Sequence, residues 1–200
     1  SWRLFHIRSP GYGGPFVFPE GVVMTIRVFS GYKPTGPLTL GNLLGSIRPA
    51  VALQDRAECL YAVVDLHALT VDHDPGAVRA RTIEVATLLR ACGLDRSVVY
   101  LQSQVTAHSE LAYLLECTAH VGELQRMIQY KQRSGQARVT RVSLLTYPVL
   151  MAADILVHRA DLVPVGDDQR QHLELTRDLA VRFNRNYGEV FTVPEAVHPP

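Results

Sequence analysis

Three features are scarce in this 200-residue sequence, and each scarcity excludes something. The formal net charge is only +1, so the chain as a whole does not attract nucleic acid, and any such contact needs a local basic patch. The three cysteines, Cys59, Cys92 and Cys117, are far apart and odd in number, which excludes a C-x-x-C pair and favours a reducing, cytoplasmic setting. No apolar run reaches the roughly 18 residues that a membrane-spanning helix needs, so we expect no membrane partner.

Apolar residues are plentiful by contrast. They make up 47% of a chain that is within the size range of one domain, so a real core can form. Residues 1–23 show neither helical nor strand periodicity and lack the order of a signal peptide. Because M-T-I-R-V-F follows directly, we predict an irregular, non-native leader over 1–23 and a domain over 24–200; a flexible N-terminal arm is the alternative. The final V-P-E-A-V-H-P-P resembles a proline-rich connection without a closing element, so we expect the domain to be incomplete there.

Strand patterns alternate with helix patterns along the chain. Short apolar or β-branched runs predict strands at 25–30, 59–65, 97–102 and 161–165, the last of them short because of Pro164. Helices are expected from Asn42 and over 74–93, 108–120, 122–133, 144–159 and 169–184. This order predicts an α/β fold: a doubly wound, mostly parallel, Rossmann-like sheet with a helical insertion.

Ligands of such sheets bind at the carboxyl ends of the strands, here 30–42, 65–69, 102–105 and 165–169. Pro49 lies inside the first expected helix, where a missing N–H costs about 3 kcal/mol, so we predict a kink or break near Ile47.

The glycine- and proline-rich turn S-G-Y-K-P-T-G-P-L-T-L-G-N follows the first expected strand and leads into a helix. Gly31, Gly36 and Gly41 permit close backbone approach and positive φ, and the helix start offers unpaired N–H groups to an anion. The pattern is neither a Walker loop nor G-x-G-x-x-G. From the residues alone, a phosphate or nucleotide site and a merely structural turn both stay open.

The same turn resembles the first signature of class I aminoacyl-tRNA synthetases, with Thr39–Asn42 in the place of H-I-G-H. From about Met24 onward, V-D-L-H-A-L-T, G-E-L-Q-R-M-I-Q-Y-K-Q-R-S, M-A-A-D-I-L and V-P-V-G-D-D-Q-R-Q-H resemble bacterial tryptophanyl-tRNA synthetases in particular. The resemblance implies a Rossmann-like catalytic domain that activates L-tryptophan with ATP and Mg²⁺ and transfers it to tRNA(Trp). It also implies a cytoplasmic homodimer without a protein-bound metal.

The resemblance implies an ATP site around the turn. Lys33, Thr35, Asn42 and Arg133 are expected to take part in catalysis, and the ATP contacts are expected from Lys33, Pro34, Thr35, Gly41, Asn42, Gly166, Asp167 and Asp168. Lys33 departs from the glutamine of many relatives, and Asp167 from their glutamate. Arg133 also belongs to a basic run, 126–141, that could meet RNA backbone, although such runs are more often solvated faces.

A tryptophan pocket is implied as well, with Asp154 accepting the indole N–H. Its other expected residues are Tyr147, Met151, Gln129, Gln169, His67, Val163 and Val165. Taken singly, most of these would be core residues, and His67 a satisfied histidine. Asp154 stands out because an unpaired carboxylate inside an apolar helix is costly; a structural carboxylate paired with arginine is its alternative.

The second class I signature, K-M-S-K-S, is absent from the 200 residues, and so is the anticodon domain. We therefore expect the chain to be a fragment that is weakly active or inactive on its own. A non-catalytic module that binds tryptophan or ATP remains an alternative, as does, with less support, the tyrosine-specific relative.

Replacing Lys33 by glutamine tests the charge in the turn. We expect Lys33→Gln to weaken the binding of ATP or of the tryptophan carboxylate, most strongly at low salt, because exposed charges are screened by ions. Calorimetric titration of both ligands at two ionic strengths measures this, and unchanged affinities at low salt would reduce Lys33 to a loop residue.

Overall fold

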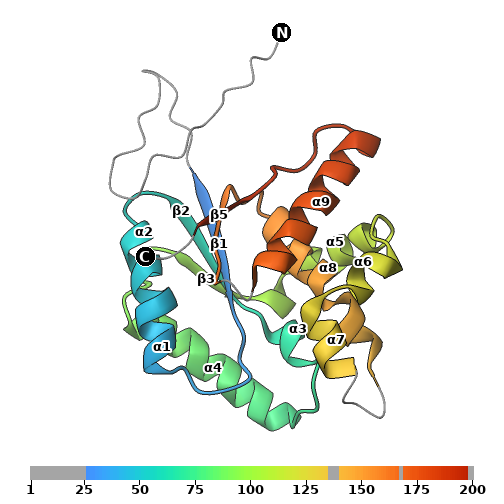
Figure 1. Ribbon diagram of the computed structural model, residues 1–200. Coiled ribbons are helices and arrows are strands. Elements are labelled where there is room, and N and C mark those ends of the chain that lie inside the picture. The colour runs from blue at the N-terminus through green and yellow to red at the C-terminus, as the bar shows by residue number, and fades with distance from the viewer. Residues whose placement is uncertain (1–25, 135–139, 167–168, 198–200) are drawn as a thin grey trace, which may run out of the picture.

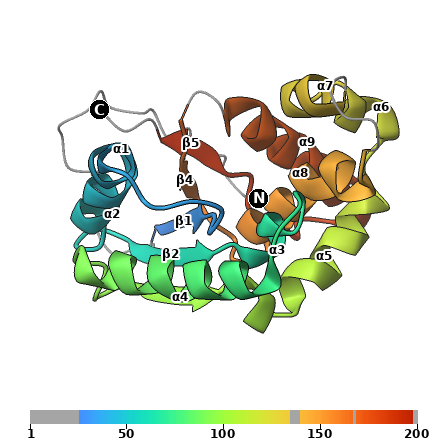
Figure 2. The same cartoon turned by 90° about the horizontal axis from the view of Figure 1, so that it is seen from below.

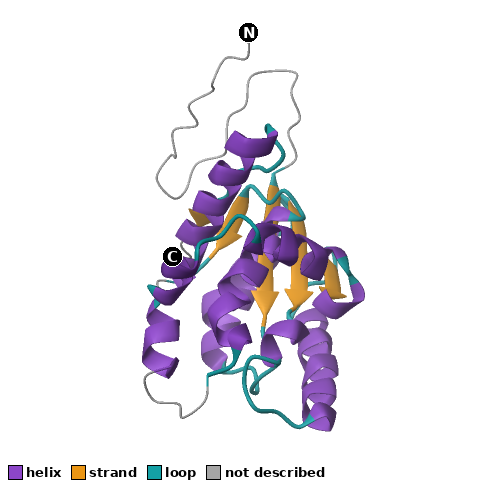
Figure 3. Cartoon of the chain, turned by 90° about the vertical axis from the view of Figure 1, so that its right-hand side faces the viewer, coloured by secondary structure: helices purple, strands orange, loops and turns teal. Residues whose placement is uncertain are grey.

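The structure is a computed structural model that describes residues 26–134, 140–166 and 169–197 (Figure 1). Within these residues lies a five-stranded sheet of order β3-β2-β1-β4-β5, in which every pairing is parallel. The strands, drawn as orange arrows in Figure 3, are β1 (Arg27–Tyr32), β2 (Glu58–Val63), β3 (Val98–Leu101), β4 (Leu162–Pro164) and β5 (Glu195–Val197). The chain order reverses between β1 and β4, which is the switch point of a doubly wound sheet.

The central strands β1 and β2 are buried on both faces, as the apolar strand runs predicted. Because side chains alternate along a strand, Val28 and Tyr61 pack on one face while Phe29 and Ala62 pack on the other. The first face is covered by Ile47 and the helices around it, and the second meets Ile155. A parallel sheet needs cover on both sides, and these two clusters provide it.

The helices form two groups on either side of the sheet (Figures 1 and 2). The first contains α1 (Leu40–Asn42), the π-helical η1 (Leu43–Ile47), α2 (Arg48–Leu53) and α4 (Pro75–Ala91). The second contains α5 (Ala107–Glu116), α6 (Val121–Gln125), α7 (Ile128–Ser134), α8 (Val142–Leu156) and α9 (Arg170–Tyr187). Two short turns, α3 (Asp65–Ala68) and η2 (Gln102–Gln104), follow β2 and β3. None of the described helices is long and apolar enough to cross a membrane.

The expected helical insertion is confirmed: α5, α6, α7 and α8 all lie between β3 and β4. Together with α9 they share a core of their own, in which Leu115, Leu124 and Val149 are buried beside Leu156 and Leu179. Arg182 of α9 forms an ion pair with Glu123 of α6 and donates to the carbonyl of Thr118 at 2.9 Å, which ties the two helices together at the surface. The insertion is therefore a second packed layer rather than a loop.

Three expectations about the strands were wrong in detail. β2 ends at Val63, two residues before its predicted end at 65, because Asp65 begins α3. β1 continues to Tyr32, two residues past its predicted end, because Gly31 and Tyr32 pair with Ala62 and Val63 of β2. The expectation of no closing element near the end of the chain was also wrong, since β5 pairs in parallel with β4 from Leu162↔Glu195 onward. Glu195–Val197 follow a proline and have little strand propensity by themselves. They form a strand because they pair with the edge of β4.

The single helix predicted over 122–133 is two helices, α6 and α7. The backbone N–H of Ile128 donates to the side-chain oxygen of Gln171 at 2.9 Å instead of continuing a helical ladder, and Met127 at the break is buried. A partner from α9 therefore holds the start of α7.

The distortion predicted from Pro49 is confirmed, and it takes the form of η1. Pro49 has no N–H to give to the preceding turn, and the five residues before Arg48 widen into a π-helix. Tyr61 donates from its hydroxyl to the Ala50 carbonyl at 3.0 Å, which fixes the segment against the sheet.

Gly93 ends α4 with φ of +105°, a conformation that L side chains rarely adopt. We expect Gly93→Ala to lower the free energy of unfolding by about 1–2 kcal/mol, measured by denaturant titration. Gly45→Ala is the matched control. Gly45 is helical and nothing lies within 4 Å of the position that a Cβ would take, so the same change there should raise stability by about 0.5–1 kcal/mol. Equal effects at both positions would contradict the backbone argument.

Candidate active site

A cavity of about 590 Å³ opens at the carboxyl ends of β1 and β4, where the strand order reverses. It is lined by Phe29, Ser30, Gly31, Lys33, Asn42, Ser46, Val64, His67, Thr70, Gln129, Tyr147, Met151, Asp154, Ile155, Val163, Pro164, Val165, Gly166 and Gln169. These residues come from β1 and β4, from the segments that follow β1, β2 and β4, and from the helical elements α1, η1, α3, α7 and α8. Its volume is within the range of small-molecule sites.

One face of α8 supplies three of the predicted pocket residues. Tyr147, Met151 and Asp154 are spaced four and three residues apart, so they lie one above the other on a helix. Met151 and the β4 residues Val163 and Val165 give the cavity apolar walls, while Asp154 is its most buried acidic group.

Asp154 is 1% exposed and receives three hydrogen bonds from described residues. Gln102 Nε2 donates to Oδ1 at 2.6 Å, and His108 Nδ1 donates to the same oxygen at 2.8 Å. His67 Nε2 donates to Oδ2 at 2.8 Å. The carboxylate can only accept, so both facing ring nitrogens carry protons. Its partners are thus histidine and glutamine, not arginine.

These donors decide the charge of Asp154. Burial by itself would raise its pKa, but the hydrogen bonds from His108, His67 and Gln102 outweigh burial and hold the pKa below its usual value. The cavity therefore ends at an ionised carboxylate, which is a stronger acceptor than a neutral acid.

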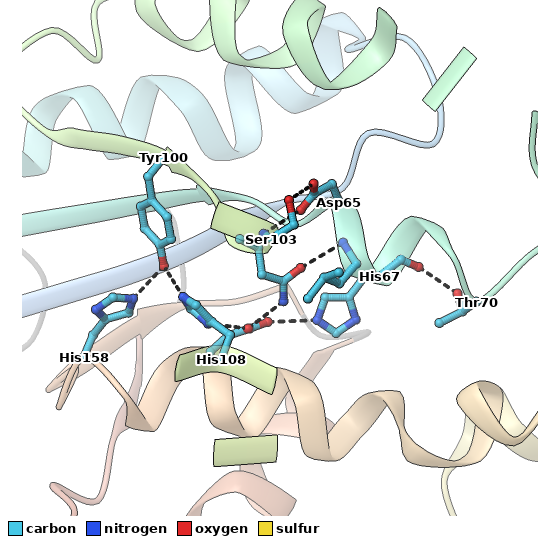
Figure 4. Close-up of polar contacts among 10 residues, drawn as sticks. Asp65, His67, Thr70, Tyr100, Ser103, His108 and His158 are labelled. Carbon is cyan, nitrogen blue, oxygen red and sulfur yellow. Dashed lines mark hydrogen bonds and ion pairs between the residues drawn. The ribbon is translucent and has the colours of Figure 1, made fainter. Parts of the chain in front are cut away.

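From Asp154 the polar contacts continue through His108 to Tyr100 and His158, which Figure 4 labels. The Tyr100 hydroxyl lies 3.0 Å from His108 Nε2 and 2.6 Å from His158 Nε2. Burial, followed by the nearby charge of Asp154, raises the pKa of Tyr100, so it stays a hydroxyl. Burial, followed by the charge of His108, lowers the pKa of His158 to about 4.

The ends of β2 and β3 are fastened together beside this network (Figure 4). Asp65 accepts from the Ser103 backbone N–H at 3.0 Å and from the Ser103 hydroxyl at 2.6 Å. The Leu66 N–H donates to Gln102 Oε1 at 3.1 Å. These bonds hold His67 and Gln102 at fixed positions, from which both reach the same carboxylate.

The opposite wall is also hydrogen-bonded. The Tyr147 hydroxyl lies 2.7 Å from Gln129 Oε1 and 2.7 Å from His172 Nε2 of α9, and its ring meets His67 edge-on. Because a carbonyl oxygen only accepts, the hydroxyl proton goes to Gln129 and His172 donates to Tyr147. Helices α7, α8 and α9 therefore meet at this hydroxyl.

Lys33 and the helix start form the mouth of the cavity. Lys33 Nζ lies 3.4 Å from the Thr70 hydroxyl, within a largely exposed turn. Thr39 and Asn42 form a capping box: Asn42 Oδ1 accepts from the Thr39 N–H at 2.8 Å, and Thr39 Oγ1 accepts from the Asn42 N–H at 3.4 Å. Asn42 thus helps to cap the helix start and also lines the cavity.

The glycines of the turn do not use positive φ, which part of the prediction expected, but the close backbone approach is confirmed at Gly31. The described glycines with positive φ are Gly93 and Gly188, so Gly31, Gly36 and Gly41 do not need that freedom. Gly31 is required for packing instead, because a Cβ there would lie 2.9 Å from Val64 Cγ1.

The structure brings together most of the predicted site residues. All eight predicted tryptophan contacts line the cavity, together with Lys33, Asn42 and Gly166. Pro34, Thr35 and Gly41 lie in the same turn but are not among the described lining residues, and Pro34 is buried. Asp167, Asp168 and the side chain of Arg133 lie outside the described residues, so those predictions stay open.

Sequence reasoning missed the residues behind the carboxylate. Gln102 and His108 are fully buried, and each bonds to Asp154. Gln102 stands at the carboxyl end of β3, one of the four places that the sheet rule indicates, so a signal was present. No sequence signal pointed to His108, because a single histidine six residues after Gln102 belongs to no recognisable motif.

The chain matches the family model for class I tRNA synthetases of tryptophan and tyrosine over residues 24–200. It therefore belongs to this family, and its parallel sheet with flanking helices is the Rossmann-like fold of class I synthetases. Within this family, curated relatives of the chain are named tryptophan–tRNA ligases. The chain is 58% identical to tryptophan–tRNA ligase 1 of Streptomyces coelicolor over 180 residues, which cover 86% of this chain and 54% of that protein.

Solved structures agree with this relationship. The tryptophanyl-tRNA synthetase of Mycoplasma pneumoniae matches with a TM-score of 0.84 and 38% identity, over 87% of this chain and 53% of that one. The enzyme of Campylobacter jejuni, solved with ADP and tryptophan, matches with a TM-score of 0.82 and 36% identity, over 86% of this chain and 55% of that one. The chain spans about half the length of the relatives that it matches.

The lowered pKa of His158 predicts a pH dependence of stability. Between about pH 6.5 and 4 the unfolded chain binds a proton at this residue and the folded chain does not, so stability falls as the pH falls through that window. We expect His158→Gln, whose amide can still bond to Tyr100, to reduce the loss of stability between pH 7 and pH 5 in denaturant titrations. His73→Gln, an exposed histidine outside the network, is the control; an equal reduction in both variants would contradict the assignment.

Proposed function

We propose that this chain carries the tryptophan pocket and part of the ATP site of a tryptophan–tRNA ligase. In this reaction the tryptophan carboxylate attacks the α-phosphate of ATP, which gives tryptophanyl-adenylate and pyrophosphate. The tryptophanyl group then passes to the terminal ribose of tRNA(Trp). Such transfers need positioning and charge stabilisation rather than a covalent enzyme group.

The observation that carries the proposal is the ionised, buried Asp154 at the end of an apolar-walled cavity. Oδ2 accepts one described hydrogen bond, from His67, and a carboxylate oxygen has room for a second donor. The indole N–H fits that position, with the ring between Met151 and the valines of β4. Phenylalanine has no donor there and would leave this acceptor position of Asp154 without a partner. In sites built around such a bond, discrimination against the analogue that lacks the donor is about 10⁴-fold or more.

The other end of tryptophan needs polar partners. Gln129, Tyr147 and Gln169 also line the cavity, and hydroxyl and amide groups suit an ammonium and a carboxylate. We place the α-amino group and the carboxylate of tryptophan there. The carboxylate then faces the mouth of the cavity, where the ATP phosphates would arrive.

ATP is placed across the turn between β1 and α1. Lys33 supplies a cation at the cavity mouth, and the start of the α1 helical segment supplies N–H groups. Thr35, Pro34 and Gly41 extend this surface, while Gly166 begins the segment proposed for the ribose. We propose that ATP arrives with Mg²⁺ bound to its phosphates, and that Arg133, Asp167 and Asp168 complete the site.

The remaining partners are proposals for the whole protein. Curated relatives named tryptophan–tRNA ligase support tRNA(Trp) as the acceptor. We propose a homodimer as its assembly and the cytoplasm as its setting. The free thiols of Cys59, Cys92 and Cys117 fit a reducing compartment.

Replacing Asp154 by asparagine tests the pocket. We expect Asp154→Asn to weaken tryptophan binding by at least about 10-fold in isothermal titration calorimetry, because the charge-assisted acceptor is lost. Asp55→Asn, an exposed aspartate paired with Arg96, is the matched control and should bind as the unchanged chain does.

Tyrosine and ATP are titrated beside tryptophan. A folded chain that prefers tyrosine would favour the tyrosine-specific alternative, and a folded chain that binds neither amino acid would refute the proposal. Wild-type affinity in a folded Asp154→Asn variant would remove Asp154 from the pocket.

A further inference from the structure

The two carboxylate oxygens of Asp154 have different hydrogen-bond partners. The partners of one oxygen lie outside the described cavity lining, and the partner of the other belongs to it. Its Oδ1 partners, Gln102 and His108, are absent from the described cavity lining, whereas its Oδ2 partner, His67, belongs to it. Oδ1 therefore points into the protein and Oδ2 toward the cavity. Two donors occupy Oδ1, and one described donor occupies Oδ2.

This arrangement restricts how a ligand can bond to the carboxylate. A third donor has no access to Oδ1, since Gln102 and His108 are 0% exposed and fill that side. The remaining acceptor position of Oδ2 is the one that a ligand can reach. Rotation of the carboxylate about its last bond would exchange the two oxygens, and the two Oδ1 donors oppose that rotation.

His108 is itself held by a second bond. Its Nε2 contacts the Tyr100 hydroxyl at 3.0 Å, and the two rings stack with centroids 5.7 Å apart. Tyr100 in turn contacts His158 Nε2 at 2.6 Å. Whichever way the hydroxyl proton points, His108 Nδ1 must keep its own proton, because the carboxylate that it faces can only accept.

We infer that His108, held by Tyr100, is a positioning residue for indole recognition: it fixes the Asp154 carboxylate so that a single acceptor position of Oδ2 faces the cavity. The inference rests on the proposed function, because it concerns how the same pocket selects its substrate. His108 does not touch the ligand. It acts by orienting Asp154 and by keeping that residue ionised against the effect of burial.

The test compares tryptophan with 3-benzothienyl-alanine, an analogue in which sulfur replaces the indole N–H. The analogue keeps the ring shape and loses the donor, so the ratio of the two affinities measures the bond to Asp154. A merely structural role for His108 would weaken both ligands equally and leave the ratio unchanged. Equilibrium calorimetry on the unchanged chain and on each variant gives both constants.

Two substitutions of His108 form a matched pair. Leucine removes the donor to Asp154, whereas asparagine places an amide N–H near the position of Nδ1. We expect His108→Leu to weaken the binding of tryptophan about 10-fold and the binding of the analogue less than about 3-fold, because the variant loses a hydrogen bond to the charged Asp154. His108→Asn should retain most of the preference for tryptophan.

Tyr100→Phe keeps the experiment decisive if His108→Leu does not fold. It removes one hydroxyl and should reduce the preference for tryptophan about 3-fold, because His108 loses its second bond. Tyr61→Phe is its control: that buried hydroxyl bonds to the Ala50 carbonyl, away from Asp154, so the preference should not change.

The outcomes separate this inference from the proposed function. If the unchanged chain is folded and binds no tryptophan, the proposed function fails. If the unchanged chain prefers tryptophan to the analogue, and folded His108→Leu or Tyr100→Phe keeps the full preference, the inference fails and the proposed function stands. A fall in both affinities by the same factor also overturns the inference.

Discussion

The burial of one carboxylate sets the conditions for this site. An ionised Asp154 inside the protein is costly unless donors replace the water that it gives up. Here the donors come from three different segments: His67 after β2, Gln102 after β3 and His108 at the start of α5. The ends of β2 and β3, α5 and α8 must therefore all be in place before the carboxylate is stable as a charge.

The parallel sheet makes this convergence possible. The carboxyl ends of β2 and β3 lie side by side, and the Asp65–Ser103 bonds fasten them. The reversal of strand order between β1 and β4 leaves an opening above α8, and the cavity occupies it. The hydrogen bonds to Asp154 and the cavity beside it thus both result from the strand order of the parallel sheet.

A division of labour follows from the geometry. The walls of the cavity give shape, Asp154 gives a directed acceptor, and the residues behind it give orientation. Lys33 and the helix start are more exposed than Asp154. Under the proposed function, the deep part would select the side chain and the open part would meet the ATP phosphates, which suits a reaction of two substrates.

Sequence patterns were sufficient for the features that depend on neighbours along the chain. Alternation of strand and helix signals predicted the doubly wound sheet and its insertion. Pro49 predicted a distorted helix because a missing N–H acts locally, and Asp74 with Gly93 predicted the limits of α4 within two residues. The motifs around Asp154 led to eight residues that the structure places along one cavity.

What only the tertiary structure decided involves partners far apart in sequence. β5 is a strand because β4 offers an edge, and α7 starts where Gln171 accepts a hydrogen bond from the N–H of Ile128. The sequence determined that a carboxylate would lie in an apolar helix. That His108 and Gln102 bond to it, 46 and 52 residues away, was decided by packing, since no local pattern records which buried donors will meet.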